Sequence, residues 1–479
     1  MLLIDNRDAA AADEARFQRR NPISNAVVSE AAAASPDDAR KAADSAGAAF
    51  EAWGAMGPNA RRAVLLKAAE LMEARASEFV AAMTAETGAT QPWAGFNVHL
   101  GAAVLREAAA LTTQVTGEII PSDRPGSIAM AVRQPAGVVL GIAPWNAPVI
   151  LGARAIATPL ACGNTVVLKS SEFCPMTHWL IGDVLRQAGL PPGVCNVVST
   201  APEGAPAAVE ALIRHPAVRR VNFTGSTRTG KVIAKICAEE LKPVLLELGG
   251  KAPFLVLDDA DLDQAVAAAA FGAFMNSGQI CMSTERIVVV ESVADAFVAK
   301  LAQKAATIRA GDPAAAGTIL GALADPKAAA RLETLIDDAV AKGAILHQAA
   351  KPEGALVSAA ILDRVTPRMA IYDEESFGPV TTIVRAADEN DAIRVANDTL
   401  YGLTSAVFTR DMARGLKVAK RLDTGMCHIN GPTVHDEAQM PFGGVKASGH
   451  GRFGGKAGID AFTELRWITM NTEPVQYPF

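Results

Sequence analysis

The stretch NTVVLKSSEFCPMTHWLIGDVLRQAGLPPGVCNVVS, residues 164–199, decides the fold class. Its two ends are β-branched runs typical of buried strands, and its middle has the apolar spacing of a helix. The same alternation continues along the chain. The strand-like runs are NTVVLK (164–169), VCNVVS (194–199), RRVNFTG (219–225) and PVLLELGG (243–250), and the helical segments are MTHWLIGDVLRQAGL (176–190), GAPAAVEALIRH (204–215) and GKVIAKICAEEL (230–241). This pattern predicts a parallel sheet with crossover helices.

A second alternating series begins near residue 252 and predicts a second α/β domain. Its strand-like runs are FLVL (254–257), RIVVV (286–290), VTTIVR (380–385) and SAVFTR (405–410), and its helical segments are DLDQAVAAAAFGAFM (261–275), VADAFVAKLAQKAATI (293–308) and DAIRVAND (391–398). Upstream, residues 37–111 have helical apolar spacing and predict an opening helical layer.

The segment FTELRWITM (462–470) reads as one more short strand with nothing after it to cover its edge. We expect this strand to pair across a subunit contact, with the strand SIAMAVRQ (127–134) as its partner. A homo-oligomer, either a dimer or a tetramer, is therefore predicted.

Composition and charge favour small-molecule chemistry. Half of the 479 residues are apolar, and the net charge is -6. Without clustered basic residues, a nucleic-acid partner is not expected. Asp5, Arg7 and Asp8 leave no room for a signal-peptide core, and prolines interrupt the longest uncharged stretch, so we expect a cytoplasmic protein without a membrane segment.

The six cysteines include no CxxC pair, so we expect free thiols and no metal site. The cysteines are Cys162, Cys174, Cys195, Cys237, Cys281 and Cys427. Cys281 lies in NSGQICMSTER (276–286), after a long apolar helix and a glycine-containing turn, where a thiol can emerge into a cleft. The alternative for any single cysteine is a small buried hydrophobe.

Glu247 lies where a hydrophobic strand ends at two glycines, in LELGGK (246–251). Apolar neighbours raise the pKa of such a carboxyl group, which can then act as a base. The alternative is an ordinary salt bridge, for example to Lys251.

Together, ELGGK and GQIC resemble the signature pair of the aldehyde dehydrogenase superfamily. Further matches are PWN (144–146), KSSE (169–172), FTGSTRTG (223–230), EESFGPV (374–380) and PFGGVKASGHGR (441–452). The resemblance implies two Rossmann-like, doubly wound domains and a small β oligomerisation domain. It assigns residues 1–118 and 138–246 to the NAD-binding domain, 247–440 to the catalytic domain, and 119–137 with 441–479 to oligomerisation or bridging segments.

The resemblance also implies the roles of three catalytic residues. Cys281 is expected to attack the aldehyde, and Glu247 to activate the water that hydrolyses the resulting thioester. The oxyanion is expected to be held by the side-chain amide of Asn146 and the backbone N–H of Cys281.

NAD is the expected cofactor, with NADP less favoured. A helix amino terminus capped by Ser226 and Thr227 presents N–H groups to a pyrophosphate, and a carboxylate at Glu172 repels the extra phosphate of NADP. The residues expected to bind the cofactor are Pro144, Trp145, Lys169, Glu172, Gly225, Ser226, Gly230, Leu248, Glu375 and Phe377.

The expected substrate is a small aromatic aldehyde. WAGFNVH (93–99), IYDEESFGP (371–379) and the carboxyl-terminal stretch resemble the aromatic-aldehyde branch of the family, which favours vanillin or a related benzaldehyde. The expected tunnel is apolar, with one cation that can meet a phenol or a ring substituent. Its expected lining is Trp93, Ile150, Leu151, Arg154, Ile280, Met282 and Phe442.

Several alternatives remain open at this point. Within the family, these are a salicylaldehyde or broad-specificity dehydrogenase, and a CoA-acylating or phosphorylating relative. Outside that chemistry, they are a cofactor-independent cysteine esterase or thioesterase, and a non-catalytic binding protein. Reduction of NAD by an aldehyde distinguishes a dehydrogenase from the last two.

Overall fold

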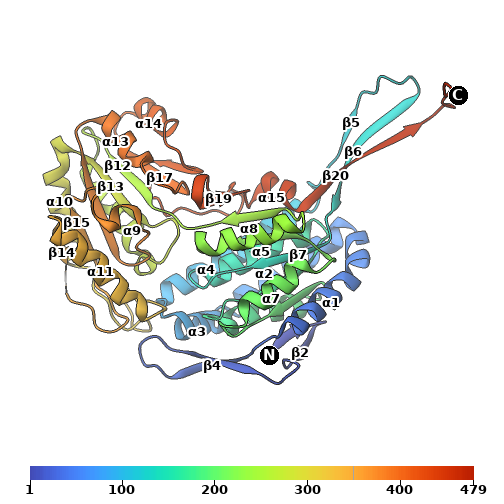
Figure 1. Ribbon diagram of the computed structural model, residues 1–479, viewed down its shortest axis with the longest axis horizontal. Coiled ribbons are helices and arrows are strands. Elements are labelled where there is room, and N and C mark those ends of the chain that lie inside the picture. Colours follow the sequence, from blue (N-terminus) through green and yellow to red (C-terminus); the bar gives the residue numbers. More distant parts are fainter. Residues whose placement is uncertain (349) are drawn as a thin grey trace.

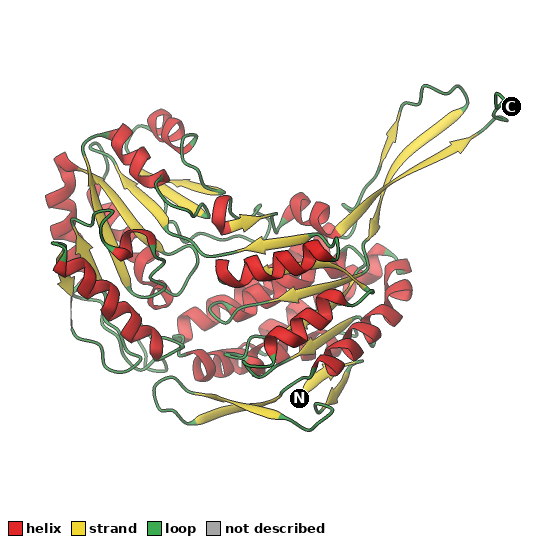
Figure 2. Ribbon diagram, in the orientation of Figure 1, coloured by secondary structure: helices red, strands yellow, loops and turns green. Residues whose placement is uncertain are grey.

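Two large sheets organise the chain, and a third, smaller sheet projects from the body as an arm (Figure 1). The computed structural model describes residues 1–348 and 350–479. The structure contains two α/β units in which strands and helices alternate along the chain, as the sequence predicts. Figure 2 shows helices packed around the strands of both units.

The first unit is built on an eight-stranded sheet with the order β19-β11-β10-β7-β8-β9-β1-β2. Strands β7 to β11 are parallel, whereas β1, β2 and β19 pair antiparallel at the two edges. The chain reverses its direction of winding between β7 and β10, which leaves a crevice at the carboxyl ends of these strands. The strands are β1 (Leu2–Ile4), β2 (Arg7–Ala9), β7 (Val138–Ile142), β8 (Thr165–Lys169), β9 (Cys195–Val198), β10 (Val218–Thr224), β11 (Val244–Glu247) and β19 (Gly449–His450).

Alternate residues of these strands bury two different helical layers, because side chains on a strand point to opposite faces in turn. Val139 packs with helices α2, α4, α5 and α6, whereas Val138 and Leu140 pack with α1, α7 and α8. The helices are α1 (Pro36–Ala55), α2 (Pro58–Ala74), α3 (Ala76–Thr87), α4 (Gln91–Leu111), α5 (Pro148–Ala161), α6 (Pro175–Gln187), α7 (Ala205–Arg214) and α8 (Thr227–Glu239). The continuous apolar runs of the strands follow from this coverage of both faces.

The second unit has a seven-stranded sheet with the order β14-β15-β16-β13-β12-β17-β18, parallel except for β14. Helices again cover both faces. The strands are β12 (Ala252–Val256), β13 (Thr284–Val290), β14 (Ile345–Gln348), β15 (Ala360–Asp363), β16 (Val380–Ala386), β17 (Thr404–Phe408) and β18 (Met426–Ile429). The helices are α9 (Leu262–Phe274), η1 (Met275–Gly278), α10 (Glu291–Ala305), α11 (Lys327–Ala341), α12 (Ala370–Asp373), α13 (Glu389–Asn397) and α14 (Met412–Ala419).

The projecting arm corrects one expectation about the carboxyl-terminal strand. β20 (Thr463–Asn471) does pair with β6 (Ser127–Pro135), but within the same chain rather than across a subunit contact. The third strand is β5 (Glu118–Ile120). Asn164 explains the intrachain pairing, because its side chain bonds the backbone N–H groups of residues 136 and 137 and the carbonyl of Phe462. The end of β6 and the start of β20 are therefore held side by side.

The amino-terminal residues form strands that the helical pattern further along did not indicate. β3 (Arg16–Arg20) and β4 (Val27–Ala32) form a separate antiparallel pair. Near the carboxyl end, η2 (Lys446–Ser448) and α15 (Gly455–Phe462) come before β20, the last strand of the arm. Across the residues that the structure describes, none of the helices combines the length and apolar character needed to cross a bilayer.

Candidate active site

Cys281 is delivered to the crevice by a tight turn between α9 and β13. Asn276 and Ser277 have left-handed backbone angles (φ +50° and +54°), and Gly278 follows with φ +71°. A Cβ at position 278 would lie 1.9 Å from the carbonyl oxygen of Gly378, so only glycine fits there. The turn leaves Cys281 partly buried, facing the end of β11 in the other unit.

Glu247 is the last residue of β11 and is 1% exposed. Neither carboxyl oxygen has a hydrogen-bond partner among the residues described. The alternative of a salt bridge to Lys251 is wrong, because the Lys251 ammonium lies 2.7 Å from Glu285 instead. Burial raises the pKa of Glu247 to about 8, against the opposing effects of the Cys281 thiol and the Arg154 cation, and the negative charges of Glu375 and Asp436 add to the rise. Near neutral pH most of this carboxyl group is therefore protonated, and its ionised fraction is a stronger base than an ordinary carboxylate.

The Cys281 thiol shares this environment. Burial, and after it the neighbouring Glu247, raises the pKa of the Cys281 thiol well above its ordinary value. The thiol is therefore protonated at neutral pH, and an adjacent positive charge or a base is needed to form the thiolate.

Asn146 follows β7 and is 5% exposed. Its side-chain amide donates to the carbonyl of Gln279 (3.0 Å). Its own backbone carbonyl accepts from the indole of Trp93 (3.1 Å) and from the amide of Asn276 (3.0 Å). These bonds fix Asn146 next to the turn that carries Cys281, with a second amide hydrogen left for another acceptor.

A cavity of about 260 Å³ lies on one side of Cys281, at the carboxyl ends of β7, β10 and β11. Away from Cys281, Glu247 and Asn146, its polar groups include the Glu375 carboxylate and the amino terminus of α8, and its apolar walls include Trp145 and Phe377 with ring centroids 5.8 Å apart. The lining is Pro144, Trp145, Asn146, Thr224, Gly225, Ser226, Glu247, Gly249, Cys281, Glu375 and Phe377. An anionic group, a ribose and a flat ring fit these three kinds of surface.

The remaining residues expected at the cofactor lie around this cavity rather than in its lining. Lys169 ends β8 and pairs with Glu172 at 3.2 Å. Gly230, in α8, packs closely against Leu248, because a Cβ at position 230 would lie 2.6 Å from the Leu248 side chain.

Ser226 caps α8, with its hydroxyl oxygen accepting from the backbone N–H of Thr229 at 3.3 Å. The expectation that Thr227 shares this cap is wrong. Thr227 is the first helical residue, and its hydroxyl donates to the carbonyl of Ala447 instead, which ties α8 to the segment before β19.

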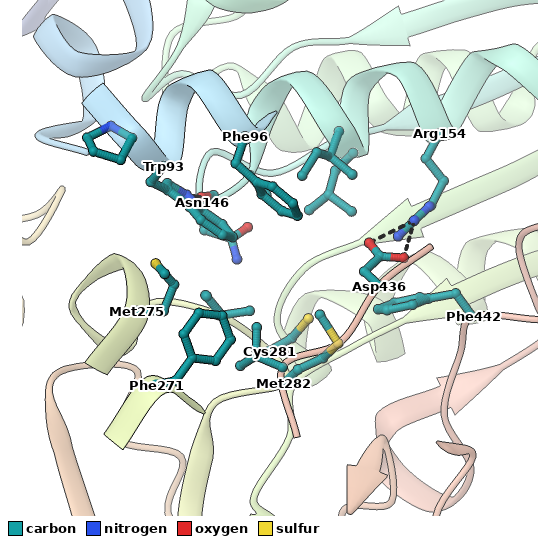
Figure 3. A pocket seen from close by; sticks show the side chains of 16 residues that line it. Trp93, Phe96, Asn146, Arg154, Phe271, Met275, Cys281, Met282, Asp436 and Phe442 are labelled. Carbon is teal, nitrogen blue, oxygen red and sulfur yellow. Dashed lines mark hydrogen bonds and ion pairs between the residues drawn. The ribbon is translucent and has the colours of Figure 1, made fainter. Parts of the chain in front are cut away.

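A second cavity of about 230 Å³ lies on the other side of Cys281 and is mostly apolar (Figure 3). All seven residues expected in the tunnel line it. The lining residues that the sequence did not identify are Pro92, Phe96, Phe271, Met275, Val434 and Asp436. Phe96 belongs to the stretch WAGFNVH that resembles the aromatic-aldehyde branch, but its helical spacing, like that of Phe271, indicated only helical packing and did not mark it as a lining residue.

Asp436 changes the expected role of Arg154. The Arg154 Nη2 donates to both carboxylate oxygens of Asp436, at 2.7 and 2.8 Å, and the guanidinium lies 4.5 Å from the centroid of the Phe442 ring. The cation is thus neutralised inside the wall (Figure 3). Nη1 of Arg154 is buried and has no partner in the described parts of the chain.

A family comparison agrees with this arrangement. The model of the "Aldehyde dehydrogenase family" matches residues 9–468. The chain belongs to the aldehyde dehydrogenase family. Both the fold class and the type of enzyme predicted from the sequence are confirmed.

Individual members of the aldehyde dehydrogenase family match the chain over 99–100% of its length. A vanillin dehydrogenase of Pseudomonas sp. (strain HR199 / DSM 7063) is 60% identical over 100% of this chain and 99% of the relative. A salicylaldehyde dehydrogenase from Pseudomonas putida G7, solved in complex with salicylaldehyde, has a TM-score of 0.98 and 49% identity, covering 100% and 99% of the two chains. A betaine aldehyde dehydrogenase from Staphylococcus aureus, solved with NAD+, has a TM-score of 0.95 and 31% identity, covering 99% and 95%.

The buried pair in the wall of this aldehyde dehydrogenase predicts a stability effect. Asp436→Ala leaves the Arg154 charge buried and unpaired, so the free energy of unfolding should fall by about 3–5 kcal/mol. Arg154→Met combined with Asp436→Leu removes both charges and should recover most of that loss. Urea unfolding of the two variants beside the wild type measures this, and a single variant as stable as the wild type would contradict the pairing.

Proposed function

We propose that the protein oxidises an aromatic aldehyde, vanillin or a related benzaldehyde, to the carboxylic acid with NAD. The observation that carries this proposal is that Cys281 and Asn146 line both cavities. A carbonyl carbon at Cys281 can therefore be reached from the apolar cavity by the aldehyde and from the other cavity by a cofactor ring.

The lining of the apolar cavity supports an aromatic substrate. Trp93, Phe96 and Phe271 provide flat surfaces, and the buried Nη1 of Arg154 offers a donor to an oxygen on the ring. The names of the vanillin and salicylaldehyde dehydrogenases above favour the same class. Salicylaldehyde, or a broad range of aldehydes, is the second candidate.

The charges near β8 support NAD over NADP. The Glu172 carboxylate, paired with Lys169 and still partly exposed, disfavours a phosphate on the adenosine ribose. When bound, the nicotinamide ring accepts the hydride of the aldehyde carbon. Glu375 is suited to bind the neighbouring ribose, and the N–H groups at the start of α8 are suited to bind the pyrophosphate.

The chain's own residues then divide the chemistry. The Cys281 thiol gives up its proton to water as its sulfur adds to the carbonyl carbon, and the oxygen that gains the negative charge is held by the Asn146 amide and the Cys281 N–H. Once the carbon is at the oxidation level of a thioester, Glu247 takes a proton from the attacking water. The C–S bond breaks, the acid leaves, and the thiol is regenerated.

The rival functions have less support from the site. A cysteine hydrolase needs no cavity for a second reactant beside its nucleophile, and a CoA-acylating enzyme needs no base such as Glu247. A non-catalytic binding protein has no use for an unbonded buried carboxylate, which is costly to maintain.

We also propose that the unit of residues 1–118 and 138–246 binds NAD, that residues 247–440 form the catalytic domain, and that 119–137 with 441–479 link subunits. Two apolar side chains of the arm, Trp467 and Ile119, are each 78% exposed, which supports burial in a homo-oligomer. Six free thiols support a reducing, cytoplasmic location, which cell fractionation tests.

Cys281→Ala should abolish aldehyde oxidation while NAD still binds, because the nucleophile and the cofactor contacts are different residues. NADH formation is followed by absorbance with vanillin, salicylaldehyde, benzaldehyde and acetaldehyde, with NAD or NADP, in variant and wild type. The control Cys427→Ala should keep full activity. Absence of NADH from the wild type with every aldehyde would refute a dehydrogenase, and substantial turnover by Cys281→Ala would move the nucleophile elsewhere.

Glu247→Gln should slow thioester hydrolysis more than hydride transfer, so a burst of NADH should precede slow turnover. The base acts only when deprotonated. In the wild type, hydrolysis should therefore rise with pH through about 8 and fall roughly tenfold per pH unit below it. Stopped-flow measurements from pH 6 to 9 should show this limb in the wild type and its loss in the variant. Equal slowing of both phases would count against the assignment.

Trp467→Glu should weaken self-association, because a charge replaces an apolar side chain on the face expected to be buried. Sedimentation velocity should show a smaller species than the wild type. Leu241→Glu, which changes an even more exposed side chain (91%) of the first unit, is the control and should leave the assembly intact. A monomeric wild type would refute the oligomer.

A further inference from the structure

A buried ion pair lies beneath the segment that carries Glu375 and Phe377. The Lys251 ammonium and the Glu285 carboxylate are 2.7 Å apart, with side-chain exposures of 0% and 3%. Lys251 also donates to the backbone carbonyl of Glu374 (2.8 Å). The pair thus joins β12 and β13 to a segment far from both in sequence.

Glu285 accepts more hydrogen bonds than this pair alone requires. Its Oε2 accepts from the backbone N–H of Ser376 (2.9 Å) and from the Ser376 hydroxyl, and its Oε1 accepts from the backbone N–H of Phe377 (2.9 Å). Bonds to an ionised acceptor are shorter and stronger than neutral ones. The carboxylate therefore fixes the backbone of two consecutive residues.

The conformation of this segment needs such support. Phe377 has φ +48°, a left-handed angle that an aromatic residue adopts only when its surroundings hold it there. The Arg331 guanidinium also donates to the carbonyl of Glu375 (3.1 Å). The Glu375 carboxylate is left to accept from the backbone N–H of Gly250 (2.8 Å) at the edge of the cavity beside Cys281.

We infer that Glu285 is a positioning residue for the dehydrogenase reaction, whose carboxylate holds Ser376 and Phe377 so that Glu375 and Phe377 meet the cofactor in a fixed geometry. This inference rests on the proposed function, which puts the cofactor ribose at Glu375. Glu285 itself lies below the cavity and touches no reactant.

Glu285 also acts on Glu375 through its charge. Burial raises the pKa of Glu375 to about 7, and the negative charge of Glu285 adds to this rise. The Gly250 N–H and the cations of Lys251 and Arg331 oppose it. Glu247, the Cys281 thiol and Tyr401 also lie within range of the Glu375 charge, and Glu247, with its pKa of about 8, adds a second rise above that of Glu375. The ionised Glu375 is the better acceptor for ribose hydroxyls, so NAD affinity should increase as pH rises through about 7.

The test is the dissociation constant of NAD, measured by calorimetry from pH 5.5 to 8.5 without aldehyde. Glu285→Gln should weaken binding about tenfold, because the positioned contacts are lost. It should also move the midpoint of the pH dependence to lower pH, since the repelling charge is gone. Glu285→Asp retains the charge on a shorter side chain, so it should weaken binding but keep the midpoint near that of the wild type.

Asp363→Asn is the matched control. Asp363 is another buried carboxylate of the same sheet and pairs with Arg385 at 2.9 Å, away from the cavity. It should lower the thermal unfolding temperature while leaving the NAD dissociation constant and its pH midpoint unchanged. A purely structural Glu285 would behave in the same way, which would overturn the inference.

Failure of the inference and failure of the proposed function give different results. If Glu375→Gln weakens NAD binding and neither Glu285 variant does, only the inference is wrong. If Glu375→Gln leaves binding unchanged, the cofactor site assigned to Glu375 is wrong and the inference falls with it. Should Glu285→Gln not fold, Glu285→Asp decides, and unchanged binding in that variant overturns the inference.

Discussion

The burial of the Glu247 carboxyl group without a hydrogen-bond partner in the described residues is the constraint on which the site depends. An ionised carboxylate in such surroundings is costly, and the cost appears as a pKa raised to about 8. The fold maintains this arrangement because β11 is an inner strand, held by β10 on one side and β19 on the other. Backbone pairing on both sides of β11 therefore holds Glu247 in a buried position that is unfavourable for its carboxyl group.

Two other pairs of buried charged groups near the site differ from Glu247, because each charge has a partner of opposite sign. Lys251 with Glu285, and Arg154 with Asp436, are paired and hydrogen-bonded. Each pair joins segments far apart in the sequence and fixes a wall: the first supports the segment of Glu375, and the second lines the apolar cavity. The Glu247 carboxyl group thus lies between two walls that are each held by a buried ion pair, which is the arrangement expected of a preorganised site.

The sequence predicted the two α/β units well, because each strand carries its own apolar signal and each helix its own spacing. The sequence also predicted that Cys281, Glu247 and Asn146 belong to one catalytic site, because each lies in a short motif that resembles the family. It did not indicate that Asp436 meets Arg154, or that Lys251 binds Glu285 rather than Glu247, because such pairings depend on tertiary distances. The prediction for the arm was wrong for a similar reason. The strand partner was correct, but nothing in the sequence pattern distinguished pairing within a chain from pairing between chains.

The two cavities have only Asn146 and Cys281 in common. Apolar substitutions in the rest of either lining leave the shape of the other cavity intact, because the two linings lie on opposite sides of the sulfur, whereas the charges of Arg154 and Asp436 still act on Glu247. Mutations in such a protein can change the preference for one reactant while the binding of the other reactant is retained. Enzymes that descend from one ancestor can therefore act on different substrates with the same catalytic residues. The separation of the linings thus makes this architecture evolutionarily modular.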